Sequence, residues 1–150
     1  MADHVRQQIR EAVGTAVTGL VTTGARVFQS RVYPLQTTEL PGLLVYTRSE
    51  TSEPTTIHAP KVLQRTLQLQ IVGVAKAVAD LDDTLDLICK EVEVAVALWS
   101  MAGLGGLAKS INLISTEYDL QGVSEKPTGS ATLLYEAEYF TLENAPSTAQ

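Results

Sequence analysis

The side chains best suited to catalysis lie in one polar stretch, residues 47–60. It contains His58, with Ser49, Ser52 and Glu53 nearby, so a nucleophile, a base and an acid could come together there. A catalytic serine is often recognised by a G-x-S-x-G elbow, and this stretch has none. We therefore interpret His58 as a solvated loop histidine, and we keep a small enzyme with its site near this loop as an alternative.

A glycine-rich segment matches the pattern of a dinucleotide-binding fingerprint. Residues 103–108 read GLGGLA, which fits G-x-G-x-x-A. That fingerprint binds pyrophosphate where it follows a strand and opens a helix, because the helix N-terminus receives the phosphate. Here the segment follows a predicted helix and precedes a predicted strand. It therefore predicts a helix end and a turn, and no cofactor is expected.

Acidic residues cluster at the start of a predicted helix, at Asp80, Asp82, Asp83 and Asp86. A calcium loop of the EF-hand type needs a central glycine and a final glutamate, which this cluster lacks. Capping and the helix dipole explain the first three carboxylates. The single cysteine, Cys89, lies on the flank of the same helix and is expected to be an inert core thiol. With only two histidines in the chain, we expect no metal site.

The composition is that of a globular protein, with 150 residues, 45% of them apolar and 19% charged. The net charge of −6 disfavours a nucleic-acid-binding protein. The longest apolar-rich run, residues 92–107, contains a glutamate and three glycines and is too short to span a membrane. The chain starts with MADHVR, which lacks the apolar core of a signal peptide, so no targeting segment is expected.

Charge is distributed unevenly along the chain. Residues 1–78 carry a net charge of +3, and residues 79–150 carry −9. Solvated faces of helices and strands can produce such an imbalance. A second interpretation is an oligomer in which the basic part of one subunit meets the acidic part of the next.

Apolar periodicity predicts two helices and five strands. Helical spacing covers residues 5–20, with Asp3 placed to cap the start, and residues 80–99, with Asp80 as the cap. Strand patterns cover residues 25–33, 43–46, 62–74, 111–120 and 131–142. Residues 47–60 are expected to form a long polar loop.

These elements predict the α+β class. We expect a mostly antiparallel sheet of about five strands, with two amphipathic helices packed on one face. Residues 1–142 are expected to form a single domain, and residues 143–150 a flexible C-terminal tail.

The strand at residues 62–74 has one apolar face and one face rich in glutamine. Glutamine offers amide donors and acceptors without charge, which suits a surface that meets another protein. Arg65 interrupts the apolar set and is expected near the start of the strand. The candidate interaction residues lie on the glutamine face and in the preceding polar stretch: Arg48, Glu50, Glu53, His58, Gln64, Gln68 and Gln70.

Several motifs resemble those of the tail terminator (tail completion) proteins of long-tailed bacteriophages. The runs RVFQSRVYPL at residues 26–35 and ELPGLLVYT at residues 39–47 are similar to the opening of that family. There a first helix leads into a strand, and an L-P-x-x-x-V-Y turn and strand follow. The strand RTLQLQIVGV at residues 65–74 and the helix start LDDT at residues 81–84 are also similar. In element order the resemblance covers residues 1–142.

The resemblance implies a small subunit that assembles with copies of itself into a hexameric ring. Such a ring caps the head-proximal end of the tail tube, ends tube polymerisation and provides the head-joining surface. The implied partners are the tail tube protein and a head–tail connector protein, and DNA would pass through the ring without specific binding. The implied location is the virion, after synthesis in the host cytoplasm. Neither catalysis, nor a cofactor, nor a membrane is implied.

A second structural interpretation stays open beside the ring and the small enzyme. The chain could be a head–tail connector or another minor tail component, which would have a similar shape but a different neighbour. Binding to the tube end separates a terminator from a connector, and ring formation with a tube-protein partner separates both from an enzyme.

Overall fold

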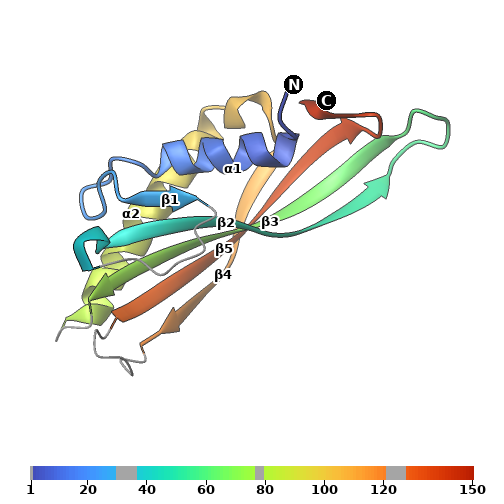
Figure 1. Ribbon diagram of the computed structural model, residues 1–150. Coiled ribbons are helices and arrows are strands. Elements are labelled where there is room, and N and C mark those ends of the chain that lie inside the picture. Colours follow the sequence, from blue (N-terminus) through green and yellow to red (C-terminus); the bar gives the residue numbers. More distant parts are fainter. Residues whose placement is uncertain (1, 30–36, 77–79, 121–127) are drawn as a thin grey trace.

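The computed structural model describes residues 2–29, 37–76, 80–120 and 128–150 (Figure 1). The helices are α1 (Val5–Ala16) and α2 (Leu81–Met101), with short 3₁₀ helices η1 (Thr37–Glu39) and η2 (Leu104–Gly106). The strands are β1 (Val27–Gln29), β2 (Gly42–Pro54), β3 (Val62–Lys76), β4 (Ser110–Asp119), β5 (Thr128–Leu142) and β6 (Ala145–Ala149). The predicted α+β class is confirmed.

The strands form one sheet in the order β1-β2-β3-β5-β4, and β6 pairs with the end of β5. The described pairs are antiparallel except β1 with β2, which is parallel, so the sheet is mixed but mostly antiparallel as predicted. The buried side chains of both helices join those of one sheet face in a single core cluster. Both helices therefore cover the same face.

Strict alternation on β3 and β5 produces this core. Every second residue is buried from Arg65 to Ala75 of β3 and throughout β5, and the residues between are half-buried on the helix-free face. Leu67, Leu69 and Ile71 of β3 meet Leu85 of α2 and Ile9 of α1 in the cluster. Burying each such side chain stabilises the fold by about 1.5–3 kcal/mol.

Glycines on the buried face allow α2 to lie close to the sheet. A Cβ atom on Gly73 would lie 2.7 Å from Cγ2 of Ile88, and one on Gly129 would lie 2.5 Å from Cδ2 of Leu81. Both distances are shorter than carbon atoms tolerate, so a larger residue at Gly73 would push α2 away from β3.

The prediction of a loop at residues 47–60 is wrong for residues 47–54. Strand β2 continues to Pro54 and pairs with β3 residue by residue, so that Glu53 lies opposite Gln64. Residues 51–54 are exposed because this part of the β2–β3 ribbon extends beyond the core. A strand that is wet on both faces lacks the alternation that reveals a half-buried strand, and only residues 55–61 form the connection. We call residues 51–61 the hairpin arm (Figure 1).

The first helix differs from its prediction at both ends. His4, not Asp3, is the N-cap residue, and its Nδ1 atom accepts a hydrogen bond of 3.2 Å from the Arg6 backbone N–H. The helix ends at Ala16, although Val17 is still fully buried. The second helix begins as predicted after Asp80, whose side chain makes no capping hydrogen bond.

The predicted strand boundaries also shift. Strand β1 covers only 27–29 of the predicted residues 25–33, and residues 30–33 lie outside the described residues. At the C-terminus, where a flexible tail was expected, Ala145–Ala149 form β6. Small polar residues give no packing pattern, but their backbones pair with β5, and Ala149 packs against the core.

A buried ion-pair network closes the core at the end where the arm begins. The Glu50 carboxylate, with 9% of its side chain exposed, accepts hydrogen bonds from Arg6 at 2.7 Å and Arg65 at 3.1 Å. The Tyr139 hydroxyl donates to its other oxygen. Nε of Arg65 donates to the Thr141 hydroxyl at 3.0 Å. Arg65 thus lies near the start of β3 as expected, but faces inward in the row of buried leucines. One carboxylate therefore joins α1, β2, β3 and β5.

We predict that Glu50→Gln lowers the free energy of unfolding by about 3 kcal/mol, because two guanidinium groups, one of them buried, lose their counter-charge. Urea denaturation of the purified protein measures this change. Glu53→Gln is the matched control. It lies three residues further along the same strand, is exposed, and should change stability by no more than about 0.5 kcal/mol. Equal effects of the two substitutions would contradict the role of Glu50.

A second prediction concerns the His4 cap. Burial lowers the pKa of His4 below its ordinary value of 6.5, and the nearby Arg6 and Arg65 add to this effect. The folded protein therefore prefers neutral His4, whose Nδ1 can accept the capping bond. The stability that His4 contributes is present above pH 6.5 and is lost as the pH falls through the lowered pKa.

The measurement compares urea denaturation of the wild type and of His4→Asn, which keeps a capping oxygen that does not titrate in this range. Between about pH 7 and pH 5, the wild type should lose stability relative to the variant. A difference between the two proteins that stays constant with pH would show that the cap does not depend on the His4 charge.

Candidate functional site

The structure separates the seven predicted interaction residues into three groups. Gln64, Gln68 and Gln70 lie on the helix-free face of β3, where they are half-buried. Three exposed residues lie along β2 and the hairpin arm: Arg48, Glu53 and His58. Glu50 faces the opposite way, and its carboxylate is held in the buried network. Glu50 therefore positions the arm and is not itself an exposed contact.

The helix-free face is a polar surface with internal hydrogen bonds. The Ser49 hydroxyl donates to Oε1 of Gln68 at 3.0 Å, and Nε2 of Gln68 donates to Oε1 of Glu136 at 3.3 Å. Gln68 lies directly opposite Glu136 in the β3–β5 register. These bonds order the polar side chains in the middle of this face.

The arm does not assemble the candidate catalytic residues. His58 lies in the connection between the strands, while Ser52 and Glu53 lie in β2, paired opposite Arg65 and Gln64. Within the part of the chain that the structure describes, no hydrogen bond joins His58 to Ser52 or Glu53. The arm instead exposes an apolar side chain, Ile57, which is 88% accessible.

Helix α2 exposes apolar residues on the side away from the sheet. Between this side and residues 16–21 lies an open groove of about 710 Å³. Its apolar lining comes from the end of α1, the following turn and α2: Ala16, Leu20, Val21, Val94, Ala95, Leu98 and Trp99. Thr22 fixes the turn, because its backbone N–H donates to Glu91 at 2.9 Å and its hydroxyl donates to the same carboxylate. Leu98 is 59% exposed, so this surface is suited to burial against another protein.

Strand β4 is the edge of the sheet opposite β1 and β2. Its residues are mostly exposed, and the exposed set includes Leu113, Ile114 and Tyr118. The Tyr118 hydroxyl donates to Asp86 of α2 at 2.5 Å, which raises the pKa of Tyr118 to about 12. A long apolar edge strand is a site for pairing with another chain unless it is covered.

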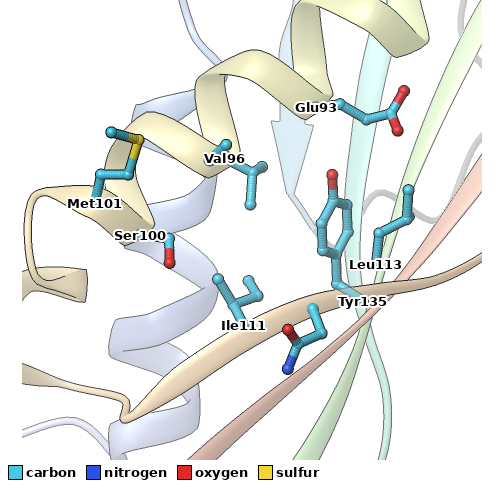
Figure 2. A pocket seen from close by; sticks show the side chains of 9 residues that line it. Glu93, Val96, Ser100, Met101, Ile111, Leu113 and Tyr135 are labelled. Carbon is cyan, nitrogen blue, oxygen red and sulfur yellow. The ribbon is translucent and has the colours of Figure 1, made fainter.

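A cleft of about 360 Å³ lies between the second half of α2 and strands β4 and β5 (Figure 2). Its lining includes four apolar side chains, Val96, Met101, Ile111 and Leu113. Tyr135 rises from β5 with its hydroxyl pointing toward α2, and the Glu93 carboxylate lies at the same end of the cleft (Figure 2). Burial, reinforced by the charge of Glu93, raises the pKa of Tyr135, so its hydroxyl stays protonated. The cleft thus combines apolar walls with one anionic group.

Sequence reasoning missed the groove and the cleft. In its second half, helix α2 is apolar on its outward side as well, at Val94, Leu98 and Met101, and this was a usable signal, because a helical segment that is apolar on both sides is normally covered on both. The cleft left no local signal, since Glu93 and Tyr135 lie far apart in the sequence and meet only through packing.

The other predicted sites take the places expected of structural residues. The glycine-rich segment follows α2 and precedes β4, and Gly103 ends the helix with φ 100°. Cys89 is buried, and burial raises the pKa of its thiol. Across the described residues, no group of three or more His, Cys, Asp or Glu side chains could hold a metal ion. None of the described helices is long and apolar enough to cross a membrane.

The comparison with protein families agrees with the phage tail resemblance. The family described as phage minor tail protein U matches residues 4–139. A chain from the virion of a native gene transfer agent particle aligns over 90% of each chain, with 13% sequence identity and a TM-score of 0.39. No curated protein matches the chain. The family match runs from the N-cap residue of α1 to Tyr139, near the end of β5. The chain therefore belongs to the phage minor tail protein U family, whose members are structural proteins of the phage tail.

Proposed function

We propose that this chain forms a ring that caps the head-proximal end of the tail tube. The ring ends tube polymerisation and provides the surface that joins the head. Membership of a minor tail protein family supports a tail location. The observation that carries the proposal is that, among the described residues, the sheet has two different free edges, each flanked by a different kind of surface.

The first free edge belongs to β2. Strand β1 covers only residues 43–45 of β2, so the outer edge of β2 beyond Tyr46 lies free within the described chain, next to the polar arm. The second free edge belongs to β4, which among the described strands pairs with β5 alone and borders α2 at the cleft that contains Glu93. Because the two edges differ, one subunit can place its β2 edge against the β4 edge of the next.

Such a contact is heterologous, and repetition of a heterologous contact gives a closed ring when the rotation closes. Closure also covers both edges in every subunit, which removes the risk of uncontrolled strand pairing. An isologous dimer would leave one of the two edges exposed. The geometry therefore favours a ring of several copies, and the family resemblance favours six.

The charge of the subunit suits a ring around a DNA channel. Exposed acidic residues lie on α2 at Asp82, Asp83 and Asp86. With a net charge of −6 for each subunit, a ring repels phosphate groups and lets DNA pass without specific binding. The proposed partners are the tail tube protein on one side of the ring and a head–tail connector protein on the other.

The proposal predicts that the purified protein sediments as a ring, alone or when tail tubes are added. Negative-stain images should show the ring at one end of each tube, and tubes polymerised in its presence should stop growing. Ring formation should weaken with salt, because the basic part of one subunit meets the acidic part of the next. A monomer at every protein and salt concentration, with and without tubes, would refute the ring. Binding to portal rings but not to tubes would identify a connector instead.

A further prediction separates assembly from folding. Leu98 is 59% exposed on α2, so Leu98→Glu should leave thermal stability nearly unchanged and abolish assembly by placing a charge in a buried contact. His58→Ala is the control, since an exposed arm side chain contributes within about 0.5 kcal/mol.

Both variants are tested by supplying each one to a phage that lacks this protein and measuring the infectivity of the progeny. Full infectivity with Leu98→Glu would show that the apolar side of α2 is not an interface. Loss of infectivity with His58→Ala, in a protein that folds and forms rings, would favour the small-enzyme alternative.

A further inference from the structure

We propose that the cleft between α2 and β4 receives a cationic side chain from the neighbouring subunit, and that Arg48 supplies it. The occupant is a second copy of this chain, so the inference rests on the proposed ring. It names the residues that join one subunit to the next.

The cleft has the chemistry of a site for a long cation. Its apolar walls can pack against the aliphatic stem of an arginine, as arginine and lysine stems do on apolar surfaces. Glu93 provides the counter-charge, and the Tyr135 hydroxyl can accept a hydrogen bond from the guanidinium group (Figure 2). The Glu93 carboxylate is exposed, and no ion pair joins it to any other part of the described chain.

The charge around the cleft favours the same occupant. Helix α2 carries five acidic side chains and a single lysine, Lys90. An approaching cation is therefore attracted to this side of the subunit, and an anion is repelled. A carboxylate or a phosphate in the cleft would be repelled by Glu93, and none of the lining residues carries a positive charge to offset that repulsion.

Among the arginines of the described chain, Arg48 alone is free to fill the cleft. Part-buried hydrogen bonds of 2.7–3.1 Å hold Arg6, Arg26 and Arg65, and Arg10 makes one long, exposed bond of 3.5 Å to Gln29. The Arg48 side chain is exposed and makes no hydrogen bond or ion pair with another described residue. An arginine in water loses little when it exchanges solvent for a carboxylate and an apolar wall.

Arg48 interrupts the pairing of β2 with β3. In the β2–β3 register Thr47 pairs with Leu69 and Ser49 pairs with Gln68, so Arg48 is the extra residue of a β-bulge. Bulges re-aim a side chain and interrupt strand pairing. Strand β4 has a corresponding shift between Leu113 and Ser115, at the residues that border the cleft.

Arg48 cannot reach the cleft of its own subunit. Strands β3 and β5 separate β2 from β4 in the sheet, which places the two edges about 14 Å apart at the usual strand spacing. Arg48 lies at one edge and the cleft at the other. Two copies placed edge to edge bring these sites together, and each copy then donates one arginine and receives one.

The test measures the subunit concentration at half-assembly by analytical ultracentrifugation of the full chain. Glu93→Gln and Arg48→Gln should each raise it by at least about tenfold, as expected when one partner of a desolvated charge pair is removed. Glu117→Gln is the matched control, since Glu117 is an exposed glutamate on β4 that does not line the cleft. It should leave assembly unchanged. The double variant Glu93→Arg with Arg48→Glu should assemble better than either reversal alone.

A cross-linking experiment tests the contact directly. Arg48→Cys and Glu93→Cys proteins, mixed and treated with a short bis-maleimide cross-linker that spans the length of the two replaced side chains, should form a covalent dimer that neither protein forms alone. Normal assembly of both glutamine variants, or no mixed cross-link between subunits that do assemble, would overturn the inference and leave the ring standing. A wild type that stays monomeric with and without tubes would overturn the ring and this contact together.

Discussion

The Glu50 carboxylate holds the fold together at the point where the hydrophobic core ends. Beyond Leu67 on β3, the inward-facing row continues with Arg65 in place of another leucine. Burying Arg65 without a partner would cost several kcal/mol, and Glu50 removes that cost while it also binds Arg6 and Tyr139. Such a pair adds little stability compared with an apolar core. The ion pair instead fixes the direction in which β2 and β3 extend beyond the core, and this direction determines where the hairpin arm lies.

The surfaces proposed to assemble the tail depend on that fixed direction. Arg48 lies two residues before Glu50, so the network that orients the carboxylate also orients the bulge that carries the arginine. At the opposite edge, α2 and β4 are held together by the Tyr118–Asp86 hydrogen bond and by packing around Tyr135. A structural protein of this kind needs rigid, dissimilar edges, because a small error in each contact accumulates around a ring.

Most of the fold could be predicted because it follows from periodicity. The helices and the central strands bury one stripe or one face each, and their alternation is visible in the sequence. The second half of β2 could not be predicted, since a ribbon that is wet on both faces has no alternation. The role of Glu50 was also hidden. Its partners come from three other segments, and a glutamate in a polar stretch gives no sign that it faces inward.

The candidate interface could be predicted only in part. Arg48 and the glutamines of β3 are interface candidates from the sequence because polar side chains without an evident structural role stand out in a strand pattern, and their role stays a prediction. The cleft was missed because it is formed by residues of three elements. We propose that dissimilar sheet edges of neighbouring subunits meet in a ring at the head-proximal end of the tube. A cryo-electron microscopy reconstruction of intact tails is the direct test of this arrangement. We expect a ring at that end with the β2 edge of each subunit facing the β4 edge of the next. Density for this chain at any other place in the tail, or a ring with both edges open to solvent, would contradict it.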